Sequence, residues 1–470
     1  MPGDLRQHWE AFRACFTTQT RDPSSQAYDY LRGMLTMEKD RHFAGISRSV
    51  QEADGQALQH FMSQSPWSGG AVFDQIQAEI RSQPGLQQGS YLILDESADE
   101  KAGSNSAGAS RQYNGHQGKV DECQVGVILG YVNWQAGPWT TWAWVDGGLF
   151  LPAEWLSEAF ADRRKKLGIP EGLSFQTKLE MGVDMIRGAQ KAELPFEGVA
   201  CDELYGRDGQ FRADLAQLPV QYMAFVPANY RVYLQCPEIG IPEKPAGKTG
   251  KAFTRVRVLN GVSSVTVKEV AADEHTQWQL LSIRPNERGV LTDRFAARRV
   301  WTWQAGQTEP RQEWLTLRID ARGEPTYALS NAPEDTPLPR LAEFICSRYF
   351  VERGIEDAKD ECGWDEFQAQ KYRAYQHHLA LTACALWFIA KEKLKWAEKC
   401  RRDPALQSEL EIEVLPALST ANVCELLRAV LPLPELSLDQ ARAHIAHHLV
   451  NRSRSKAARL RHQAKNHSPT

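Results

Sequence analysis

The chain has 470 residues, of which 42% are hydrophobic, and its formal net charge is -4 at pH 7. This length allows a sizeable core divided into roughly two to four structural units. The small negative charge excludes a uniformly basic nucleic-acid binder, so any DNA contact must come from local basic patches.

The nine cysteines are scattered and form no CxxC pair. This usage is typical neither of a disulfide framework nor of a zinc site, and it favours a reducing, cytoplasmic setting. The N-terminus has no signal-peptide pattern, and the best apolar run, at 379–390, is too short to span a bilayer. We therefore expect no membrane association and interpret this run as a buried helix.

Residues 1–88 predict a helical N-terminal domain, because apolar residues such as Leu58, Phe61 and Met62 recur at helical spacing. In 89–230, three segments predict strands: YLILDES, whose apolar run stops at Asp95, CQVGVILGYV and TTWAWVDGGLFL. A polar helix (TKLEMGVDMIRGAQKAE), a strand ending at Asp202 and the strand VQYMAFVPA follow. This order predicts an α/β fold with a mixed sheet and flanking helices.

Residues 231–335 contain many short alternating segments, among them SSVTVKEV, RRVWTWQ and EWLTLRID, and predict a β-rich insertion. In 336–400 we expect one long helix from about Leu341 through Lys359 and then the buried apolar helix at 371–395, so that the α/β domain resumes. Residues 401–470 predict a helical C-terminal region with a basic tail. That tail could bind phosphates or be a solvated end.

The candidate chemistry lies on two strand ends and one helix. Asp95 and Asp202 each end an apolar run, where open α/β sheets present ligand-binding groups. On the helix, Glu352 lies about 40° and Lys359 about 20° around the axis from Arg348, so the three share one face. Two aspartates and a glutamate are suitable oxygen ligands for Mg²⁺ in phosphoryl transfer.

Each of these residues also has an ordinary structural interpretation. Glu352, Glu356 and Lys359 could form ion pairs on a solvated helix face, and either aspartate could cap a loop. Glu356 lies about 80° around the helix from Arg348 and is the second candidate for the third carboxylate.

Four blocks of sequence occur together: LILDES with RQYNGHQGK, LFLPAEWL with RRKKLGIP, VACDELYGRD, and YALSNAP through RYFVERGIEDAKDECGWDEFQ. In this combination the chain resembles bacterial insertion-sequence transposases of the DDE type, in the branch whose ribonuclease-H-like domain is interrupted by a β-rich insertion. The resemblance implies that Asp95, Asp202 and Glu352 coordinate two Mg²⁺ ions per active site, for which Mn²⁺ can substitute.

The resemblance also implies that Arg348 and Lys359 belong to a tyrosine, arginine, glutamate, lysine signature. Ile345 stands in the tyrosine position, with Tyr349 nearby. The implied activity is binding of the terminal inverted repeats, cleavage of the DNA ends and their joining to target DNA, in related members through hairpin intermediates. The implied partners are double-stranded DNA and a second copy of the chain in a synaptic complex associated with the bacterial nucleoid.

Aromatic and basic residues supply further candidate DNA contacts. In related enzymes a tryptophan of the insertion stabilises a flipped base, for which Trp301, Trp303 and Trp314 are candidates, although each could be a core or sheet-face aromatic. The basic candidates, which could equally be ordinary surface residues, are Arg111, Lys119 and Arg207.

Two other functions fit the same chain: a catalytically inactive relative retained as a DNA-binding regulator, and a nuclease on this fold that cuts without strand transfer. The presence of all three acidic positions argues against the regulator.

Overall fold

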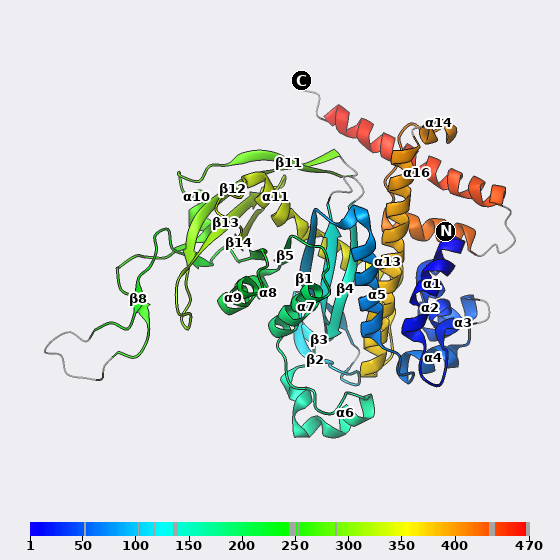
Figure 1. Cartoon of the computed structure of the whole chain (residues 1–470), viewed down its shortest axis with the longest axis horizontal. Helices are drawn as coiled ribbons and strands as arrows, with labels where there is room; N and C mark the ends of the chain where they lie inside the picture. Colours follow the sequence, from blue (N-terminus) through cyan, green and yellow to red (C-terminus); the bar gives the residue numbers. More distant parts are fainter. Residues whose placement is uncertain are drawn as a thin grey trace.

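A computed structural model of the chain describes residues 1–50, 53–101, 103–115, 118–134, 140–243, 251, 253–286, 289–403, 405–431 and 438–466. Within these residues a ten-stranded sheet forms the centre, and helices pack on both of its faces (Figure 1). This architecture confirms the predicted α/β class with a mixed sheet and flanking helices.

The strands of the large sheet are β1 (Ser90–Glu100), β2 (Ser110–Asn114), β3 (Lys119–Asn133), β4 (Thr141–Leu149), β5 (Gly198–Cys201), β6 (Tyr222–Phe225), β11 (Gln279–Asn286), β12 (Gly289–Thr302), β13 (Arg311–Ile319) and β14 (Pro325–Ser330). Their order is β11-β12-β13-β14-β6-β5-β1-β3-β2, and β4 also pairs with β3. Strand β1 is parallel to β5 and antiparallel to β3, and β5 is parallel to β6. Two short pairs lie outside this sheet: β7 (Arg231–Val232) with β10 (Val265–Thr266), and β8 (Ile239–Gly240) with β9 (Arg257–Val258).

The helices are α1 (Pro2–Phe16), α2 (Ser24–Thr36), α3 (Phe43–Ser49), α4 (Gly55–Ser63), α5 (Gly69–Ser82), α6 (Ala161–Leu167), α7 (Lys178–Lys191), α8 (Glu203–Gly206), α9 (Gly209–Gln217), α10 (Val267–Ala272), α11 (Leu338–Ser347), α12 (Tyr349–Cys362), α13 (Tyr372–Arg402), α14 (Leu406–Glu409), α15 (Thr420–Val430) and α16 (Leu438–Asn466). Figure 1 shows α1 to α4 gathered beside α13, which runs along the sheet. In the part of the chain that the structure describes, every helix is too short or too polar to cross a bilayer.

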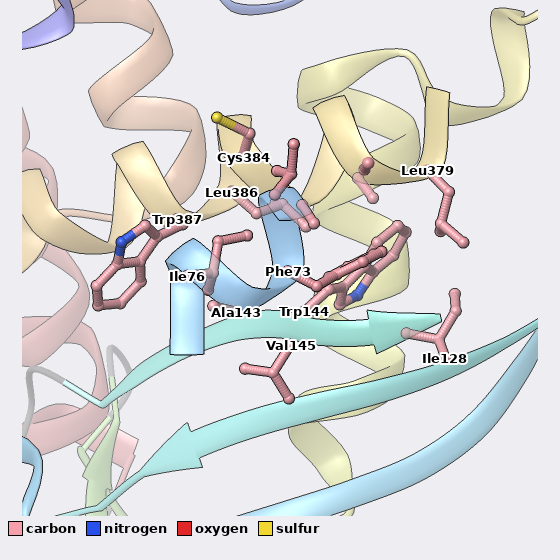
Figure 2. Close-up of a cluster of buried hydrophobic side chains, with 14 of the residues drawn as sticks. Phe73, Ile76, Ile128, Ala143, Trp144, Val145, Leu379, Cys384, Leu386 and Trp387 are labelled. Carbon is pink, nitrogen blue, oxygen red and sulfur yellow. The ribbon is translucent and has the colours of Figure 1, made fainter. Parts of the chain in front are cut away.

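The apolar run at 379–390 forms the buried centre of α13, as predicted. Figure 2 shows it meeting α5 and β4, with Phe73 and Trp144 between the layers and Leu379 above Ile128. Burying side chains of this size contributes about 1.5–3 kcal/mol each. This packing fixes the helical N-terminal region, through α5, onto the sheet.

Side-chain alternation along β1 determines which helices cover which face. Leu94 points to α7, and Gly182 allows the close approach because a Cβ there would collide with the Leu94 side chain. Ile93 belongs to the cluster beneath α11 and α12 on the opposite face, where Val351 approaches Gly130 of β3. Asp95, two residues after Ile93, shares that second face.

Two predicted strand boundaries are wrong. Strand β1 continues past Asp95 to Glu100, because the long strand β3 pairs with it over its whole length. The segment SSVTVKEV forms only two strand residues before α10 begins, because Thr266 and Glu269 form a reciprocal capping box that starts a helix. One strand is not among those predicted from the sequence: β2, between β1 and β3, which pairs with β3.

The predicted single helix through Lys359 is two helices that meet at Arg348. The hydroxyl of Ser347 donates to the carbonyl of Phe344 at 2.8 Å, and the amide of Val351 donates to the carbonyl of Arg348 at 3.1 Å. Local side-chain bonding of this kind competes with the helical ladder and bends helices. At the C-terminal end, the basic tail continues α16 as far as Asn466.

The β-rich segment at 231–335 extends the central sheet. Strand β14 pairs antiparallel with β6, joining Ala328 to Phe225 and Ser330 to Met223. Strands β11 to β14 therefore share one hydrogen-bonded sheet with β1 and β5. The domain boundaries given above stay a prediction.

Candidate active site

The strand register brings Asp95 and Asp202 together. Leu94 of β1 pairs in parallel with Cys201, the last residue of β5, so Asp95 and Asp202 are the residues that directly follow this pair on the two neighbouring segments. Ile93 and Ala200, two positions earlier on each strand, both pack under α11 and α12. Because side chains alternate along a strand, both aspartates belong to that same face.

Local hydrogen bonds hold Asp202 at the end of β5. Its carboxylate accepts from the amides of Leu204 at 2.9 Å and Tyr205 at 3.4 Å, and so caps α8. Gly206 closes this turn against β6, where a Cβ would collide with the carbonyl oxygen of Phe225. Glycine is therefore required at this position.

Arg348, at the junction of α11 and α12, links two of the predicted acidic residues. Its guanidinium lies 3.5 Å from the Asp95 carboxylate and 2.6 Å from the Glu352 carboxylate. The Arg348 side chain is mostly buried over the Phe225 ring, whereas the Glu352 side chain is 52% exposed. Arg348 thus provides the positive charge between a buried and an exposed carboxylate.

Burial makes both aspartates harder to ionise. Burial raises the pKa of Asp95 to about 7, which Arg348 lowers and the Asp202 carboxylate raises further. Burial likewise raises the pKa of Asp202 to about 6, with the charge of Glu96 adding to the rise and Arg348 opposing it. A further cation would stabilise both ionised carboxylates.

The donor set fits a hard cation in its chemistry, because carboxylate oxygens are the ligands that Mg²⁺ prefers. Among the residues that the structure describes, however, no three acidic, histidine or cysteine side chains lie close enough to hold a metal ion. Glu352 instead pairs with Arg348. Asp95 would thus be the buried part of such a site, Asp202 its half-buried part and Glu352 its exposed part.

The structural interpretations of these residues also describe real contacts, since Asp202 caps α8 and Glu352 forms a spaced ion pair. Glu356, the second candidate for the third carboxylate, is exposed and pairs with Arg353 at 3.2 Å. Of the two glutamates, Glu352 alone has a described link to Asp95, through Arg348.

The other basic residues of the prediction lie further away. Lys359 is close to Asp99: burial raises the pKa of Asp99, and the charges of Lys101 and Lys359 lower it. Asp99 is four residues, or roughly 13 Å, along β1 from Asp95. Lys359 therefore lies on the same side of the sheet as Asp95 but not in contact with it.

Arg111 and Lys119 lie on the exposed β2–β3 hairpin at the edge of the sheet. Lys119 pairs with Asp121 at 2.8 Å and is nine residues, roughly 30 Å, along β3 from the residue opposite Asp95. Arg207 is exposed just after α8. Of the three, only Arg207 follows an aspartate of the site closely in sequence.

The three candidate tryptophans differ in their contacts. The indole N–H of Trp303 donates to the carbonyl of Gln307 at 3.1 Å, and that of Trp314 donates to the carbonyl of Pro333 at 2.9 Å. Trp301 is partly exposed at the end of β12, and its backbone pairs with Tyr233. Trp303 and Trp314 therefore have structural contacts through their indole rings.

Glu96 is a site neighbour that the sequence reasoning did not select. It forms an ion pair with Lys178 of α7 at 3.0 Å, and its Oε2 atom is buried without a hydrogen-bond partner in the described ranges. The signal was its position next to Asp95, which places a second carboxylate on the opposite face of β1.

A groove of about 580 Å³ lies on the exposed face of α4, between that helix and the segment before α13. Exposed side chains from α4 and its C-terminal end form one wall, and residues 368–371 form the other. None of the described residues that line it is acidic. Its polar side chains are Gln56, Gln59, His60, Ser63, Gln64, Gln368, Gln370 and Lys371.

Comparison with known proteins shows the family of the chain. The family described as DDE superfamily endonuclease matches residues 11–290, a range that includes Asp95 and Asp202 and ends before Glu352. The "Probable transposase for insertion sequence element IS701" of Microchaete diplosiphon is 26% identical over 353 residues, covering 74% of this chain and 78% of that protein. These similarities confirm the resemblance to insertion-sequence DDE transposases. The chain belongs to the DDE superfamily endonuclease family.

Proposed function

We propose that the chain is a transposase that binds the terminal inverted repeats of an insertion sequence, cleaves the DNA ends and joins them to target DNA. The observation that carries this proposal is the adjacent register of Asp95 and Asp202, on the sheet face where Arg348 connects Asp95 to Glu352. The transposase named among the relatives supports the same reaction.

Asp95, Asp202 and Glu352 would hold two Mg²⁺ ions, or Mn²⁺ in their place. When bound, such ions stabilise charge on phosphoryl oxygens and lower the pKa of an attacking water or 3′ hydroxyl. The protein supplies the buried carboxylates, and the cap on α8 fixes the orientation of the Asp202 side chain.

Arg348 has a second part in this proposal. Its planar guanidinium matches a phosphate as well as it matches a carboxylate. A DNA phosphate that forms an ion pair with Arg348 would displace Glu352 from that guanidinium. Binding of DNA and completion of the acidic site would then be linked through one side chain.

The helical N-terminal region would recognise the repeats. Glutamine amides can form two hydrogen bonds with the edge of an adenine in the major groove of DNA. A lysine can contact DNA phosphates, and it does so best where no acidic side chain of the protein lies nearby to repel the phosphate. The groove along α4 offers both kinds of group. Synapsis of two DNA ends would require a homodimer, acting in the cytoplasm at the nucleoid.

The decisive experiment incubates the purified chain with labelled DNA carrying the inverted repeats that flank its gene, a target plasmid, and Mg²⁺ or Mn²⁺. Cleavage at the repeat ends followed by joining to the plasmid supports the proposal. Cleavage without joining would identify a nuclease, and repeat binding without cleavage would identify a DNA-binding regulator. Either result would overturn the proposed strand transfer.

A further inference from the structure

A buried ion pair joins α9 to the β-rich insertion. Arg212 of α9 and Glu313 of β13 are 0% and 1% exposed, and the Nε of Arg212 lies 3.1 Å from the Glu313 carboxylate. Tyr222 and Thr302 also donate to Glu313, and Arg212 donates to the hydroxyl of Tyr230 at 2.9 Å. Each oxygen of this buried carboxylate is therefore satisfied.

The same pair reaches the turn that carries Asp202. Arg212 donates to the carbonyl of Gly206, the last residue of α8, and the amide of Gly206 donates to the carbonyl of Asp202 at 2.8 Å. The chain of contacts thus runs from β13 through one guanidinium to the backbone of the second aspartate.

A second set of bonds holds the segment between α8 and α9. Gln304, just after β12, donates to the carbonyl of Arg207 at 2.9 Å and accepts from the amide of Gly209 at 3.0 Å. Arg311, at the start of β13, donates to the carbonyl of Gly209 at 2.9 Å. The β12–β13 hairpin therefore forms several hydrogen bonds with the backbone of Arg207 and Gly209, which follow Asp202 in the chain.

The charge state of the pair is well defined. Burial alone would raise the pKa of Glu313, but the guanidiniums of Arg212 and Arg311 and the donated hydroxyl bonds hold that pKa below its ordinary value. Glu313 thus stays ionised, and removing its charge would leave Arg212 buried without a counterion.

We propose that Glu313 and Arg212 are positioning residues for Asp202, so that the β12–β13 hairpin sets where this carboxylate stands beside Asp95. The inference rests on the proposed function for its catalytic meaning. Its structural content, a dependence of the α8 turn on Glu313, can be measured without DNA.

The matched control is Asp293 of β12, a second buried carboxylate of the hairpin, which pairs with Arg318 of β13. Its side chain is 1% exposed and lies 2.8 Å from Arg318. By strand alternation Asp293 shares the face of Phe295, under α11, whereas Glu313 shares the face of Leu315. Asp293→Asn therefore disturbs the same hairpin on the side away from α8.

The first test measures amide hydrogen exchange at Leu204 and Tyr205, whose N–H groups Asp202 caps. We expect Glu313→Gln to speed exchange there by roughly tenfold, the effect of weakening about one hydrogen bond, and Asp293→Asn to leave it unchanged. Wild-type exchange in Glu313→Gln, or equal acceleration in both variants, would overturn the proposal.

The second test measures the rise in melting temperature that Mn²⁺ produces, and the Mn²⁺ concentration for half-maximal cleavage. A displaced Asp202 predicts a smaller rise and a roughly tenfold higher concentration in Glu313→Gln, with repeat binding unchanged. If Glu313→Gln fails to fold, both quantities are measured on Tyr222→Phe, which removes one hydrogen-bond donor to Glu313 and should change them in the same direction.

The two proposals fail separately. A wild-type chain that neither cuts nor joins DNA, with faster exchange in Glu313→Gln, would end the transposase proposal and leave the positioning link intact. Normal cleavage by the wild type with no response of Glu313→Gln in exchange or metal dependence would do the reverse.

Discussion

The guanidinium of Arg348 lies 2.6 Å from the carboxylate of Glu352, one helical turn further along the chain. The same guanidinium reaches Asp95 at 3.5 Å, so one cation serves a buried and an exposed acid. The ion pair with Arg348 therefore holds Glu352 at the edge of the site. For Glu352 to bind a metal ion this pair would have to break, with a phosphate taking the place of Glu352 on Arg348.

Replacing Glu352 tests its place in the site. We expect Glu352→Gln to lower strand cleavage by more than roughly 100-fold while repeat binding is largely kept. Loss of a residue that only supports a metal ligand already costs up to about 100-fold, so loss of a ligand should cost more. Asp95→Ala and Asp202→Ala should behave alike. Gel shifts and cleavage assays give both readouts. Glu356→Gln is the control, and loss of cleavage in it but not in Glu352→Gln would refute the assignment.

The buried aspartates predict a pH dependence of stability. Burial raises the pKa of Asp95 from 3.8 to about 7 and that of Asp202 from 3.8 to about 6. The folded chain keeps protons that the unfolded chain releases near pH 4. The contribution of these two groups to the free energy of unfolding is therefore highest below pH 4 and falls as pH rises from about 4 to 7, by on the order of 2–4 kcal/mol between pH 5 and pH 8.

Denaturant unfolding at pH 5 and pH 8 measures this effect. Asp95→Asn removes the group with the larger shift, so we expect this variant to lose most of the difference and to be more stable than the wild type at pH 8. An identical pH dependence in the two proteins would contradict the electrostatic account of the site. Divalent cations should raise wild-type stability at pH 8 by binding the ionised form.

The glutamine-lined groove predicts sequence-dependent binding. The double change Gln56→Ala and Gln59→Ala should weaken binding to the terminal repeat, by about 1–3 kcal/mol for each glutamine that pairs with a base, and leave binding to unrelated DNA nearly unchanged. Gln7→Ala, an exposed glutamine of α1 outside the groove, is the control. Fluorescence anisotropy with both DNAs distinguishes the cases, and equal weakening on both would contradict base readout.

The tryptophans of the insertion can be separated by their contacts. Trp301→Ala should reduce stacking on an extruded base, worth about 1–3 kcal/mol, with little loss of stability. Trp303→Ala removes an indole bond to Gln307 and should lower the melting temperature instead. A 2-aminopurine probe at the cleaved end reports the stacking. If the 2-aminopurine stacking signal were lost in Trp303→Ala but kept in Trp301→Ala, Trp303 and not Trp301 would be the tryptophan that stacks on the base.

Much of the fold could be predicted because local pattern and burial agree. The apolar strands, the polar helix α7 and the buried run of α13 each have one period and clear ends. Boundaries set by partners could not be predicted: β1 passes Asp95 only because β3 lies beside it, and α12 separates from α11 through a side-chain bond of Ser347. The partner strand β3 is not visible in the local pattern of β1, and the periodicity of 341–359 continues across Ser347 although its hydroxyl bonds to Phe344, three residues away.

The site shows the same division. The sequence predicted that Arg348 and Glu352 share a helix face, because residues four apart on a helix are neighbours, but it assigned the ion pairs of this face to Glu352, Glu356 and Lys359 and not to Arg348. It did not predict that Arg348 reaches Asp95, which depends on how α11 meets the sheet. Glu313 left a readable signal, since its alternation with Leu315 and Leu317 places a charge at an inward position of β13. Its partner Arg212, on another segment, could not be inferred.

The ladder between β14 and β6 has a mechanical consequence. Three residue pairs, from Ala328 with Phe225 to Ser330 with Met223, splice the insertion into the same sheet as the two aspartates. A rigid-body rotation of the insertion about the β14–β6 pairing would break backbone hydrogen bonds inside the sheet, so the insertion is not hinged at this point. A displacement of the insertion that keeps this ladder intact would have to twist the shared sheet, and such a twist would reach the strand ends that carry Asp95 and Asp202.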